Sequence, residues 1–512
     1  MPVESITRAG KFATDVLLTH SYHLANDPKQ VRKMQPYPPL GTLYAASALR
    51  AADKSVAVFD SLLEDPLLGF PQALKQHCPA IVVIYEDDFN FLSKMCLTSM
   101  RALAWQLASM AKMAGAVVVA HGSDASDHAE AYLRNGVDFV LLGEAEQSLV
   151  DLCFSLLSGT SPKNIPGLLQ LDVKGNLLES TSKAPKNPNW NKFFSPAREL
   201  IDLQPYRKAW VEAHGQFSTN VVASRGCPYK CNWCAKPISG NRYQLRPPEL
   251  VAAEICELKT AYGVEHIWFG DDVFALNHRW VEQFANEIES RDCVLPFKIQ
   301  SRADLMNIST VANLKRAGCA EIWMGVESGS QKVLDAMDKG LQVSEVIQAT
   351  QLLRDAGIRA CFFLQFGYPG ELWDDIRQTI DLVLSLRPDD IGVSFSYPLP
   401  GTLFYERVQE QIGLKRNWTD SDDLCLMFRA TYRDEFYLAL RNALHAEVAS
   451  WQGTDASQSG QDRTQLWQRV FELESVTRNI DPISIAQNIP SPSLGGQPFV
   501  PLQALTSTAK EM

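Results

Sequence analysis

Residues 225–234 read Arg-Gly-Cys-Pro-Tyr-Lys-Cys-Asn-Trp-Cys and place Cys227, Cys231 and Cys234 at the spacing C-x3-C-x2-C. Three thiolates on one loop can bind three irons of a 4Fe-4S cluster and leave the fourth iron without a protein ligand. Such an open iron can coordinate a substrate or a cofactor. Zinc is the alternative, but structural zinc usually takes two cysteine pairs. The sequence has no second pair, and His214, the nearest upstream histidine, gives no regular ligand spacing.

The composition is that of a globular protein with two or three domains. The chain has 512 residues, of which 46% are hydrophobic and 21% charged, and its net charge is −11. This length exceeds a single hydrophobic core. No basic block is present, so we expect no nucleic-acid partner. The N-terminus lacks an apolar leader and no run of about 18 uncharged apolar residues occurs, so we expect a cytoplasmic protein without an integral membrane segment.

The chain has eleven cysteines, and those outside the run 227–234 stand singly. This pattern predicts reduced thiols in a cytosolic protein and not a disulfide framework. Cys256, Cys293, Cys319 and Cys361 fall in predicted helices or strands or at their ends, and they lack cluster spacing. We expect these four to be free core residues.

Five short apolar runs alternate with helical stretches in the N-terminal third. The predicted strands are 15–19, 56–60, 80–85, 116–120 and 138–142. Continuously apolar strands between helices indicate an α/β fold with a parallel, doubly wound sheet. Ligands bind such sheets at the carboxyl ends of the strands. Those ends carry polar residues and glycines, each of which could also be ordinary turn chemistry: His20, Asp60, Glu86, Asp87, Asp88, Gly122, Ser123, Asp124, Gly143 and Glu144.

From residue 219 the alternation of strand and helix resumes and repeats six times. The predicted strands are 221–224, 266–269, 297–300, 321–324, 361–365 and 391–396. Six βα units are too few for a closed eight-stranded barrel, but functional residues should still lie at the carboxyl ends of the strands. Trp268, Trp323 and Met324 point along these strands, and we expect them to fill the barrel.

The cysteine run, with the aromatic Trp233 before its third cysteine, resembles the cluster loop of the radical S-adenosylmethionine (SAM) superfamily. The six βα units resemble the partial (βα)6, TIM-like barrel of these enzymes over about residues 219–412. The resemblance implies that the open iron chelates the amino and carboxylate groups of SAM. One electron, from a flavodoxin- or ferredoxin-type donor, then cleaves SAM to a 5′-deoxyadenosyl radical.

The same resemblance implies a set of SAM-binding residues at the strand ends of the barrel. Asp271 and Asp272 take the place of a glycine-glutamate motif and would accept hydrogen bonds from the SAM ammonium. Ser301 suits a ribose hydroxyl and Arg302 the SAM carboxylate, because a guanidinium fork matches a carboxylate bidentately. Glu327 could hold the ribose; for Arg302 or Glu327 alone, a partly buried ion pair is the alternative. The full set is Trp233, Asp271, Asp272, Ser301, Arg302, Glu327, Gly367 and Gly370.

The N-terminal third resembles the cobalamin-binding Rossmann-like domain that precedes many radical SAM barrels. The matching pieces are the run 38–41, Gly122, Ser123, Gly136, Asp138, Gly143, Glu144 and Glu146, among which Gly41, Gly122, Ser123, Gly143 and Glu144 are the implied cobalamin contacts. The motif Asp-x-His-x-x-Gly, whose histidine binds cobalt from below, is absent, and Asp127-His128 has the wrong spacing. We therefore expect a lower face that is open, water-bound or touched by a side chain other than histidine. If an imidazole does bind, His20, His23 and His128 are the candidates.

The predicted domain order has five parts. Residues 1–157 form the cobalamin-binding-like domain, 158–198 a Pro-rich linker with a short hairpin, and 199–412 the barrel. A helical extension covers 413–480, and the Pro-, Ser- and Gln-rich segment 481–512 is predicted to be a disordered tail.

The resemblance implies a cobalamin-dependent radical SAM enzyme that methylates an unactivated carbon of a small molecule. An anaerobic oxidative cyclase of the magnesium-protoporphyrin monomethyl ester type has the same domain order and stays open as an alternative. A cobalamin or iron-sulfur sensor is a more remote one, because no DNA-binding motif or basic face is visible. Aromatic residues suggest an apolar or planar substrate, although such residues at a barrel rim are more often packing: Phe89, Phe91, Trp373, Tyr397, Phe404 and Tyr405.

Overall fold

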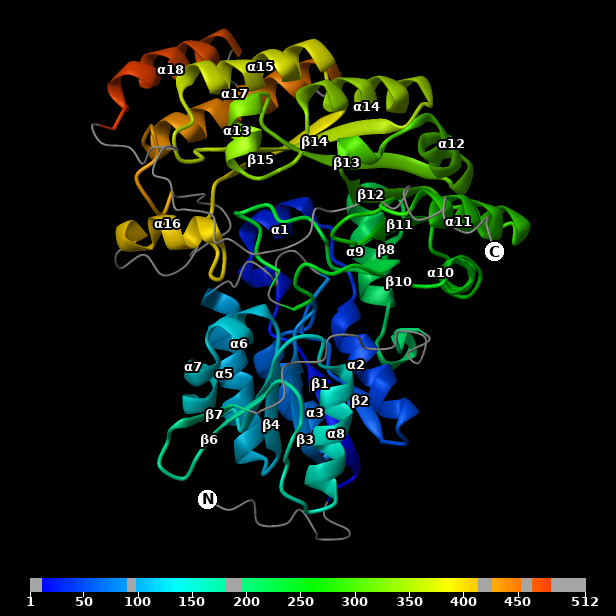
Figure 1. Ribbon diagram of the computed structural model, residues 1–512. Helices are drawn as coiled ribbons and strands as arrows, with labels where there is room; N and C mark the ends of the chain where they lie inside the picture. The colour runs from blue at the N-terminus through cyan, green and yellow to red at the C-terminus, as the bar shows by residue number, and fades with distance from the viewer. Residues whose placement is uncertain are drawn as a thin grey trace, which may run out of the picture.

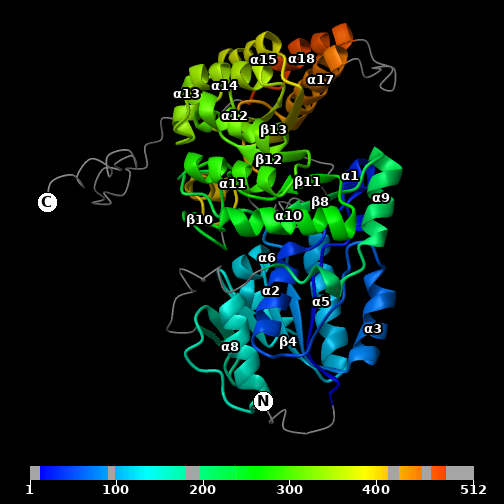
Figure 2. The same cartoon turned by 90° about the vertical axis from the view of Figure 1, so that its right-hand side faces the viewer.

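The computed structural model describes residues 12–89, 98–179, 195–236, 238–412, 426–452 and 463–479. A seven-stranded and a six-stranded sheet each form the centre of a domain. The N-terminal domain lies below the barrel, and the last two helices of the described chain (434–452 and 463–476) lie at the top, away from the N-terminal domain (Figures 1 and 2). Within the described residues no helix is long and apolar enough to cross a membrane.

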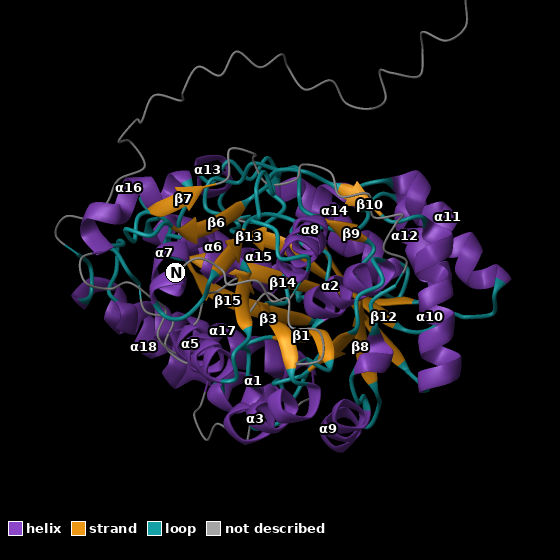
Figure 3. Cartoon of the chain, turned by 90° about the horizontal axis from the view of Figure 1, so that it is seen from below, coloured by secondary structure: helices purple, strands orange, loops and turns teal. Residues whose placement is uncertain are grey.

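The N-terminal sheet has the strand order β2-β1-β3-β4-β5-β6-β7. Its first five strands are parallel: β1 Thr14–Thr19, β2 Val56–Val58, β3 Pro79–Tyr85, β4 Val117–His121 and β5 Phe139–Leu141. Alternate residues face opposite sides: Leu17 and Val82 pack toward α3 (Pro66–His77) and α5 (Thr98–Met113). Val16 and Val83 pack toward α2 (Leu40–Ala51) and α8 (Glu146–Leu157). Figure 3 shows the strands between these helices, so the sheet is buried on both faces as its apolar runs predicted.

Two strands that the sequence assigned to the linker belong to this sheet instead. β6 (Leu168–Leu171) pairs antiparallel with β5, and β7 (Leu177–Glu179) pairs antiparallel with β6. Leu168 and Leu169 are buried, which explains why the hairpin docks on the sheet edge. The sheet therefore continues to residue 179, beyond the predicted boundary at 157. Residues 180–194 of the predicted linker lie outside the described residues.

The second sheet is parallel and follows chain order from β8 to β15, with two edges, so the barrel is open. Its strands are β8 Ser218–Val221, β11 His266–Phe269, β12 Phe297–Ser301, β13 Cys319–Glu327, β14 Arg359–Phe366 and β15 Asp390–Phe395. The six predicted strands are thus present, and Met324 is fully buried among them. Between and behind them lie α10 Pro248–Tyr262, α11 His278–Ser290, α12 Ile308–Ala317, α13 Gln331–Ala336, α14 Val343–Asp355 and α15 Trp373–Leu386.

The first barrel strand begins three residues earlier than predicted, at Ser218 instead of 221. Its polar residues have partners: Ser218 Oγ lies 2.8 Å from His266 Nδ1, and Asn220 Nδ2 donates to Pro38 O at 2.9 Å. Ser224, which was predicted to end this strand, instead forms β9 (Ser224–Arg225) together with Arg225, and β9 pairs antiparallel with β10 (Gln244–Leu245). This two-stranded ribbon closes the base of the cysteine loop.

One cysteine pair departs from the expectation of free thiols. Cys256 of α10 is bonded to Cys293, just after α11, with a Cα–Cα distance of 5.3 Å. The two helices pack side by side, and this brings together residues 37 positions apart. The sequence could not reveal this disulfide, because the two cysteines stand far apart along the chain. Cys319 and Cys361 are free and buried, as expected.

The C-terminal extension consists of α16 (Leu403–Ile412), α17 (Asp434–Gln452) and α18 (Arg463–Val476). Helix α17 packs on α18 and on β15 (Figure 1). Phe91, parts of the predicted extension (413–425 and 453–462) and the tail predicted to be disordered (481–512) lie outside the described residues.

Candidate functional site

The three cysteines lie on the loop between β9 and β10, beyond the carboxyl end of the first barrel strand. Cys227, Cys231 and Cys234 are free and half-buried. Gly226 enters the loop at φ +75°, and a Cβ there would lie 2.4 Å from Arg242 O, so only glycine fits. Burial raises the pKa of the Cys227 thiol and raises that of Cys234 to about 12. Metal binding would therefore have to displace protons from these thiols.

The cysteine loop offers a donor set that suits an iron-sulfur cluster. Among the described residues, no group of three His, Cys, Asp or Glu side chains is placed as ligands of a single ion. Cys227, Cys231 and Cys234 are three free, half-buried thiols on one loop, and each thiolate of a 4Fe-4S site binds a different iron.

Backbone carbonyls of the loop are held by a lysine that the sequence did not single out. Lys236 Nζ donates to Cys227 O at 3.1 Å, to Tyr229 O, and to Asn241 Oδ1 at 2.6 Å. An ammonium bound to two carbonyls of the loop fixes its first half. In the sequence, only the position of Lys236, two residues after the last cysteine, pointed to a role in holding this loop.

Asp271 and Asp272, predicted as a pair, lie in different surroundings. Asp271 is 2% exposed; its Oδ2 accepts from Ala223 N at 3.0 Å and its Oδ1 from the Ser224 hydroxyl. Burial raises the pKa of Asp271 to about 7, although these hydrogen bonds oppose the shift. Asp271 thus holds the chain that leads into the loop, whereas Asp272 lines a cavity beside Gly226.

Arg302 lies beneath the loop and is already bound. Its Nε and Nη2 donate to Asp304, Nη1 donates to Lys339 O at 2.9 Å, and Nη2 donates to Gly340 O at 2.8 Å. The guanidinium carbon lies 3.7 Å from the ring centre of Tyr229, which stands between the first two cysteines. These contacts use four of the five N–H bonds. The predicted bidentate contact with a SAM carboxylate would have to displace one of them.

Glu327 stands at the end of β13 in a left-handed conformation, with φ +62°. Its carboxylate is paired with Lys339 at 2.7 Å, and both side chains are 7% exposed. A Cβ on Gly325 would lie 2.8 Å from Glu327 Oε1 and from Lys339 Nζ, so the glycine makes room for the pair. A strained residue held by a buried ion pair is typical of functional sites. Lys339 follows a short helix and had no sequence signal.

Of the other predicted SAM residues, Ser301 ends β12, Gly367 and Gly370 follow β14, and Trp233 lies in the cysteine loop. Ser301 Oγ donates to Phe274 O at 2.7 Å, and the Trp233 Nε1 is buried without a partner among the described residues. Gly367 and Gly370 have φ of +79° and +78°. The Gly367 N–H donates to Glu371 Oε2 at 2.6 Å, and burial raises the pKa of Glu371 to about 8.

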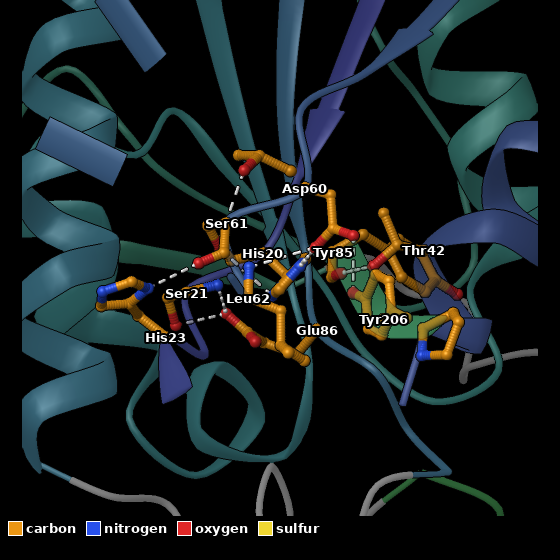
Figure 4. Close-up of polar contacts among 12 residues, drawn as sticks. His20, Ser21, His23, Thr42, Asp60, Ser61, Leu62, Tyr85, Glu86 and Tyr206 are labelled. Atoms are coloured by element: carbon orange, nitrogen blue, oxygen red, sulfur yellow. Dashed lines mark hydrogen bonds and ion pairs between the residues drawn. The ribbon is translucent and has the colours of Figure 1, made fainter. Parts of the chain in front are cut away.

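The carboxyl edge of the N-terminal sheet carries a buried polar network (Figure 4). His20 Nε2 lies 2.9 Å from Asp60 Oδ1, and the Tyr206 hydroxyl donates to Asp60 Oδ2 at 2.6 Å. Glu86 Oε1 accepts from the backbone N–H and the hydroxyl of Ser21 at 3.0 and 2.5 Å. Burial would lower the pKa of His20, but Asp60 raises it above its ordinary value. His20 Nδ1 lies 3.3 Å from Ser61 Oγ, so both ring nitrogens of His20 have hydrogen-bond partners.

The glycines predicted to contact cobalamin are required by packing. A Cβ on Gly41 would lie 2.9 Å from Asp88 N, and one on Gly122, at φ +139°, would lie 2.7 Å from Glu86 Cβ. Gly143 also has positive φ, and Glu144 is buried. Glu86 Oε2 and Asp88 Oδ1 are buried without a partner among the described residues. Unpaired buried carboxylate oxygens call for donors, and the peripheral amides of cobalamin are donors of that kind. This edge therefore fits the group.

The two domains meet at the cysteine loop. Arg225, next to Gly226, forms a buried ion pair with Glu146 at the N-terminus of α8. Trp210 of α9 (Gln204–His214) donates to Pro36 O at 2.7 Å. A cavity between the domains is lined from both sides: Asp88, Phe89 and Ser123 from the N-terminal domain; Ser224, Arg225, Gly226, Lys236, Ile238, Ser239, Gly270 and Asp272 from the barrel. The structure thus brings the predicted Ser123 and Asp272 together beside the cysteine loop.

Residues 221–383, which include the cysteine loop and most of the barrel, match the model of the Radical SAM superfamily. These residues therefore form a radical SAM domain. The chain is 27% identical over 388 residues to an uncharacterized methyltransferase of Pyrococcus horikoshii, covering 74% of this chain and 81% of that protein. It is 26% identical over 297 residues to the anaerobic magnesium-protoporphyrin IX monomethyl ester cyclase of Cereibacter sphaeroides, covering 54% of this chain and 45% of that protein.

A solved structure shares the fold of this chain. The radical S-adenosylmethionine methyltransferase TsrM from Kitasatospora setae, solved with cobalamin and a [4Fe-4S] cluster bound, superposes with a TM-score of 0.63 at 19% identity. The match covers 78% of this chain and 75% of that one. The predicted fold class, an N-terminal Rossmann-like sheet followed by a radical SAM barrel, is confirmed, and so is the prediction of an enzyme.

Proposed function

We propose that this protein is a cobalamin-dependent radical SAM methyltransferase that acts on an unactivated carbon of a small molecule. The cavity between the domains carries the proposal, because it joins the cysteine loop to the carboxyl edge of the Rossmann-like sheet. Both edges are the ligand-binding edges of their folds. A substrate bound at this junction would lie between the cluster and the cobalamin.

When bound, a 4Fe-4S cluster with SAM supplies a 5′-deoxyadenosyl radical, and cobalamin supplies a methyl group. The role of the protein chain is to position these groups and to exclude water from the site. Cys227, Cys231 and Cys234 would hold the cluster. The buried pair Arg225–Glu146 holds the loop against the N-terminal domain. The loop itself is braced by Lys236 and by the stack of Arg302 on Tyr229.

The residues predicted to bind SAM fall into two groups, possible SAM contacts and residues that hold the chain around the site. Asp272 reaches the cavity and could accept from the SAM ammonium. Trp233, Ser301, Glu327, Gly367 and Gly370 stay proposed contacts, as the strand ends place them on the same side of the barrel as the loop. Asp271 and Arg302 are better supported as groups that hold the chain around the site.

For cobalamin, we propose that Gly41, Gly122, Ser123, Gly143 and Glu144 shape the edge where it binds, with no histidine below the cobalt. His20 faces Asp60 and Ser61, and His121 faces Asp88 at 2.9 Å and Leu141 O at 3.0 Å. Burial would lower the pKa of His121, but Asp88 raises it above its ordinary value. Both ring nitrogens of each imidazole are thus engaged in hydrogen bonds and are not free to bind a metal.

The test is anaerobic reconstitution with iron, sulfide and cobalamin, followed by reduction in the presence of SAM. We expect one 4Fe-4S cluster, bound cobalamin and release of 5′-deoxyadenosine. A triple Cys227→Ala, Cys231→Ala, Cys234→Ala variant that keeps its cluster would reject the site. We further propose a flavodoxin- or ferredoxin-type protein as the natural electron donor and, since such a cluster is oxygen-sensitive, a cytoplasmic setting.

A second candidate function is oxidative cyclisation, because the cyclase of Cereibacter sphaeroides is among the relatives. Isotope labelling followed by mass spectrometry of the product distinguishes methylation from oxidative cyclisation. With methyl-deuterated SAM, a methyltransferase transfers the label to its substrate. In oxygen-18 water, an oxidative cyclase that hydrates its intermediate places the heavy oxygen in the product instead.

A further inference from the structure

The cysteine loop contains one residue that is unlike its neighbours. Asn232 is 4% exposed, whereas the rest of 227–236 is half-buried or exposed wherever the structure describes it. It stands directly after Cys231 and two residues before Cys234. A polar side chain buried inside a loop of exposed neighbours must find hydrogen-bond partners or lose stability.

Every hydrogen-bonding group of Asn232 has a partner. Its Nδ2 donates to Ala336 O at 2.8 Å and to Asp338 Oδ2 at 2.9 Å, and its Oδ1 accepts from the Tyr368 hydroxyl at 2.9 Å. Its backbone N–H donates to Met337 O at 3.1 Å, and its backbone carbonyl accepts from Phe404 N at 3.0 Å. These partners come from three places distant in sequence: the end of α13, the loop after β14 and the start of α16.

Tyr368 extends the same set of contacts. Its side chain is 1% exposed, and its hydroxyl also lies 2.8 Å from Ala336 O, so one proton is shared between two acceptors. Arg407 Nη1 donates to the hydroxyl at 3.2 Å, and the Tyr368 ring stacks on Phe404 at 5.5 Å and 28°. The hydroxyl is thus fixed from both sides.

The segment that receives Asn232 also holds the groups around the predicted SAM site. Residues 336–338 bind Asn232, and the next two residues, Lys339 and Gly340, bind Arg302 through their carbonyls. The Lys339 side chain carries the buried ion pair with Glu327. One short segment therefore joins the middle of the cysteine loop to the ends of β12 and β13.

We propose that Asn232, together with Tyr368, is a positioning residue that sets the place of the cluster relative to the SAM-binding strand ends. The proposal rests on the proposed cluster at Cys227, Cys231 and Cys234. Asn232 itself touches neither cluster nor SAM. It acts by holding the backbone between the second and third cysteines against residues 336–338.

The first test is hydrogen exchange of the iron-free protein, which does not depend on any cofactor. Asn232→Asp keeps the shape and the acceptor for Tyr368, but it turns the donor into an acceptor that faces Asp338 and Ala336 O. We expect the amides of residues 231–235 to exchange about ten-fold or more faster in this variant, because the loop opens locally. Lys230→Ala, an exposed change in the same loop, is the matched control and should exchange like the wild type.

A charge swap tests whether the contact is direct. Asp338→Asn alone is conservative, since Asn tolerates the left-handed backbone at φ +51°. Combined with Asn232→Asp, it restores a donor facing an acceptor. The double variant should recover part of the lost protection, and no recovery would overturn the assignment. Should Asn232→Asp fail to fold, Tyr368→Phe removes only the hydroxyl and should loosen the same amides to a smaller degree.

The second readout is the reduced cluster. We expect Asn232→Asp to incorporate iron, but to show a weaker change in its electron paramagnetic resonance (EPR) spectrum on addition of SAM than wild type or Lys230→Ala. Wild-type exchange together with a wild-type response to SAM would refute the proposal. If the wild type itself incorporates no cluster, the proposed function fails, while the exchange data on the iron-free protein still decide the role of Asn232.

Discussion

Replacing Arg302 by lysine tests whether this guanidinium braces the cysteine loop or binds a ligand. Lysine keeps the charge, but its single nitrogen can replace only one of the three guanidinium nitrogens, so it keeps one or two of the four hydrogen bonds to Asp304, Lys339 O and Gly340 O. Two or three lost hydrogen bonds at about 1 kcal/mol each amount to about 2–3 kcal/mol. Loss of the stack on Tyr229, at 3.7 Å, adds about 0.5–1 kcal/mol. We therefore expect Arg302→Lys to lower the free energy of unfolding of the iron-free protein by about 2.5–4 kcal/mol.

The assay is urea unfolding of wild type, Arg302→Lys, Asp304→Asn and the double variant. Because Arg302 and Asp304 are partners, the cycle should show a coupling energy of about 1 kcal/mol or more. SAM affinity of the reconstituted protein is measured beside it. Stability changed by less than about 0.5 kcal/mol, together with SAM affinity lowered about ten-fold, would refute the bracing role. That result would restore the role that the sequence predicted for Arg302, a contact with the SAM carboxylate.

Three other predictions follow from the same structure. Single changes of Cys227, Cys231 or Cys234 to alanine should abolish the iron-sulfur absorbance and SAM cleavage, and retained absorbance would point to other ligands. Reduced cobalt(II) cobalamin bound to the protein should show no histidine-nitrogen hyperfine coupling in EPR, because His20 and His121 face acceptors with both ring nitrogens; a clear coupling would leave His23 or His128 as the ligand. Burial raises the pKa of Glu371 to about 8, so the folded state disfavours the ionised carboxylate. The buried carboxyl therefore lowers the free energy of unfolding more and more as the pH rises from the pKa of the unfolded chain toward 8. Relative to wild type, Glu371→Gln should gain stability between pH 5 and 8, by up to about 1.4 kcal/mol per pH unit in urea unfolding, and a difference that is constant with pH would contradict this.

Apolar runs allowed the strands of both sheets to be predicted from the sequence within a few residues. The errors arose where polar residues lie in strands or where packing adds a strand. Ser218 and Asn220 are polar but have partners across the strand and the domain interface, so the hydrophobic pattern placed the first barrel strand three residues too late. The β6–β7 hairpin joins the sheet through Leu168 and Leu169, and its amino-acid composition resembled that of a linker.

The three cysteines could be singled out from the sequence because their spacing is local, whereas the groups that hold the loop could not. Asn232 is separated from Ala336 by 104 positions and from Tyr368 by 136. Lys339 stands 12 residues after Glu327, across a helix that no motif marks. The disulfide Cys256–Cys293 likewise depends on two helices packing side by side. Contacts of this kind are set by the topology of the barrel, and a single sequence does not encode them in any local pattern.

The interface between the domains fixes the site before any cofactor binds. Burial opposes ionisation of Glu146, yet Arg225 holds the pKa of Glu146 below its usual value, so the pair is charged although both side chains are almost inaccessible. Breaking a buried pair by removing one partner costs about 3–5 kcal/mol. Arg225 immediately precedes Gly226, at the entry to the cysteine loop, and Glu146 begins the helix that follows the Gly143-Glu144 turn. The same contact therefore places the cysteine loop and the carboxyl edge of the N-terminal sheet relative to each other. Two further hydrogen bonds link the domains, from Tyr206 to Asp60 and from Trp210 to Pro36 O. A radical formed at one edge and a methyl donor held at the other would then be kept at a separation set by folding, with the substrate as the only variable component between them.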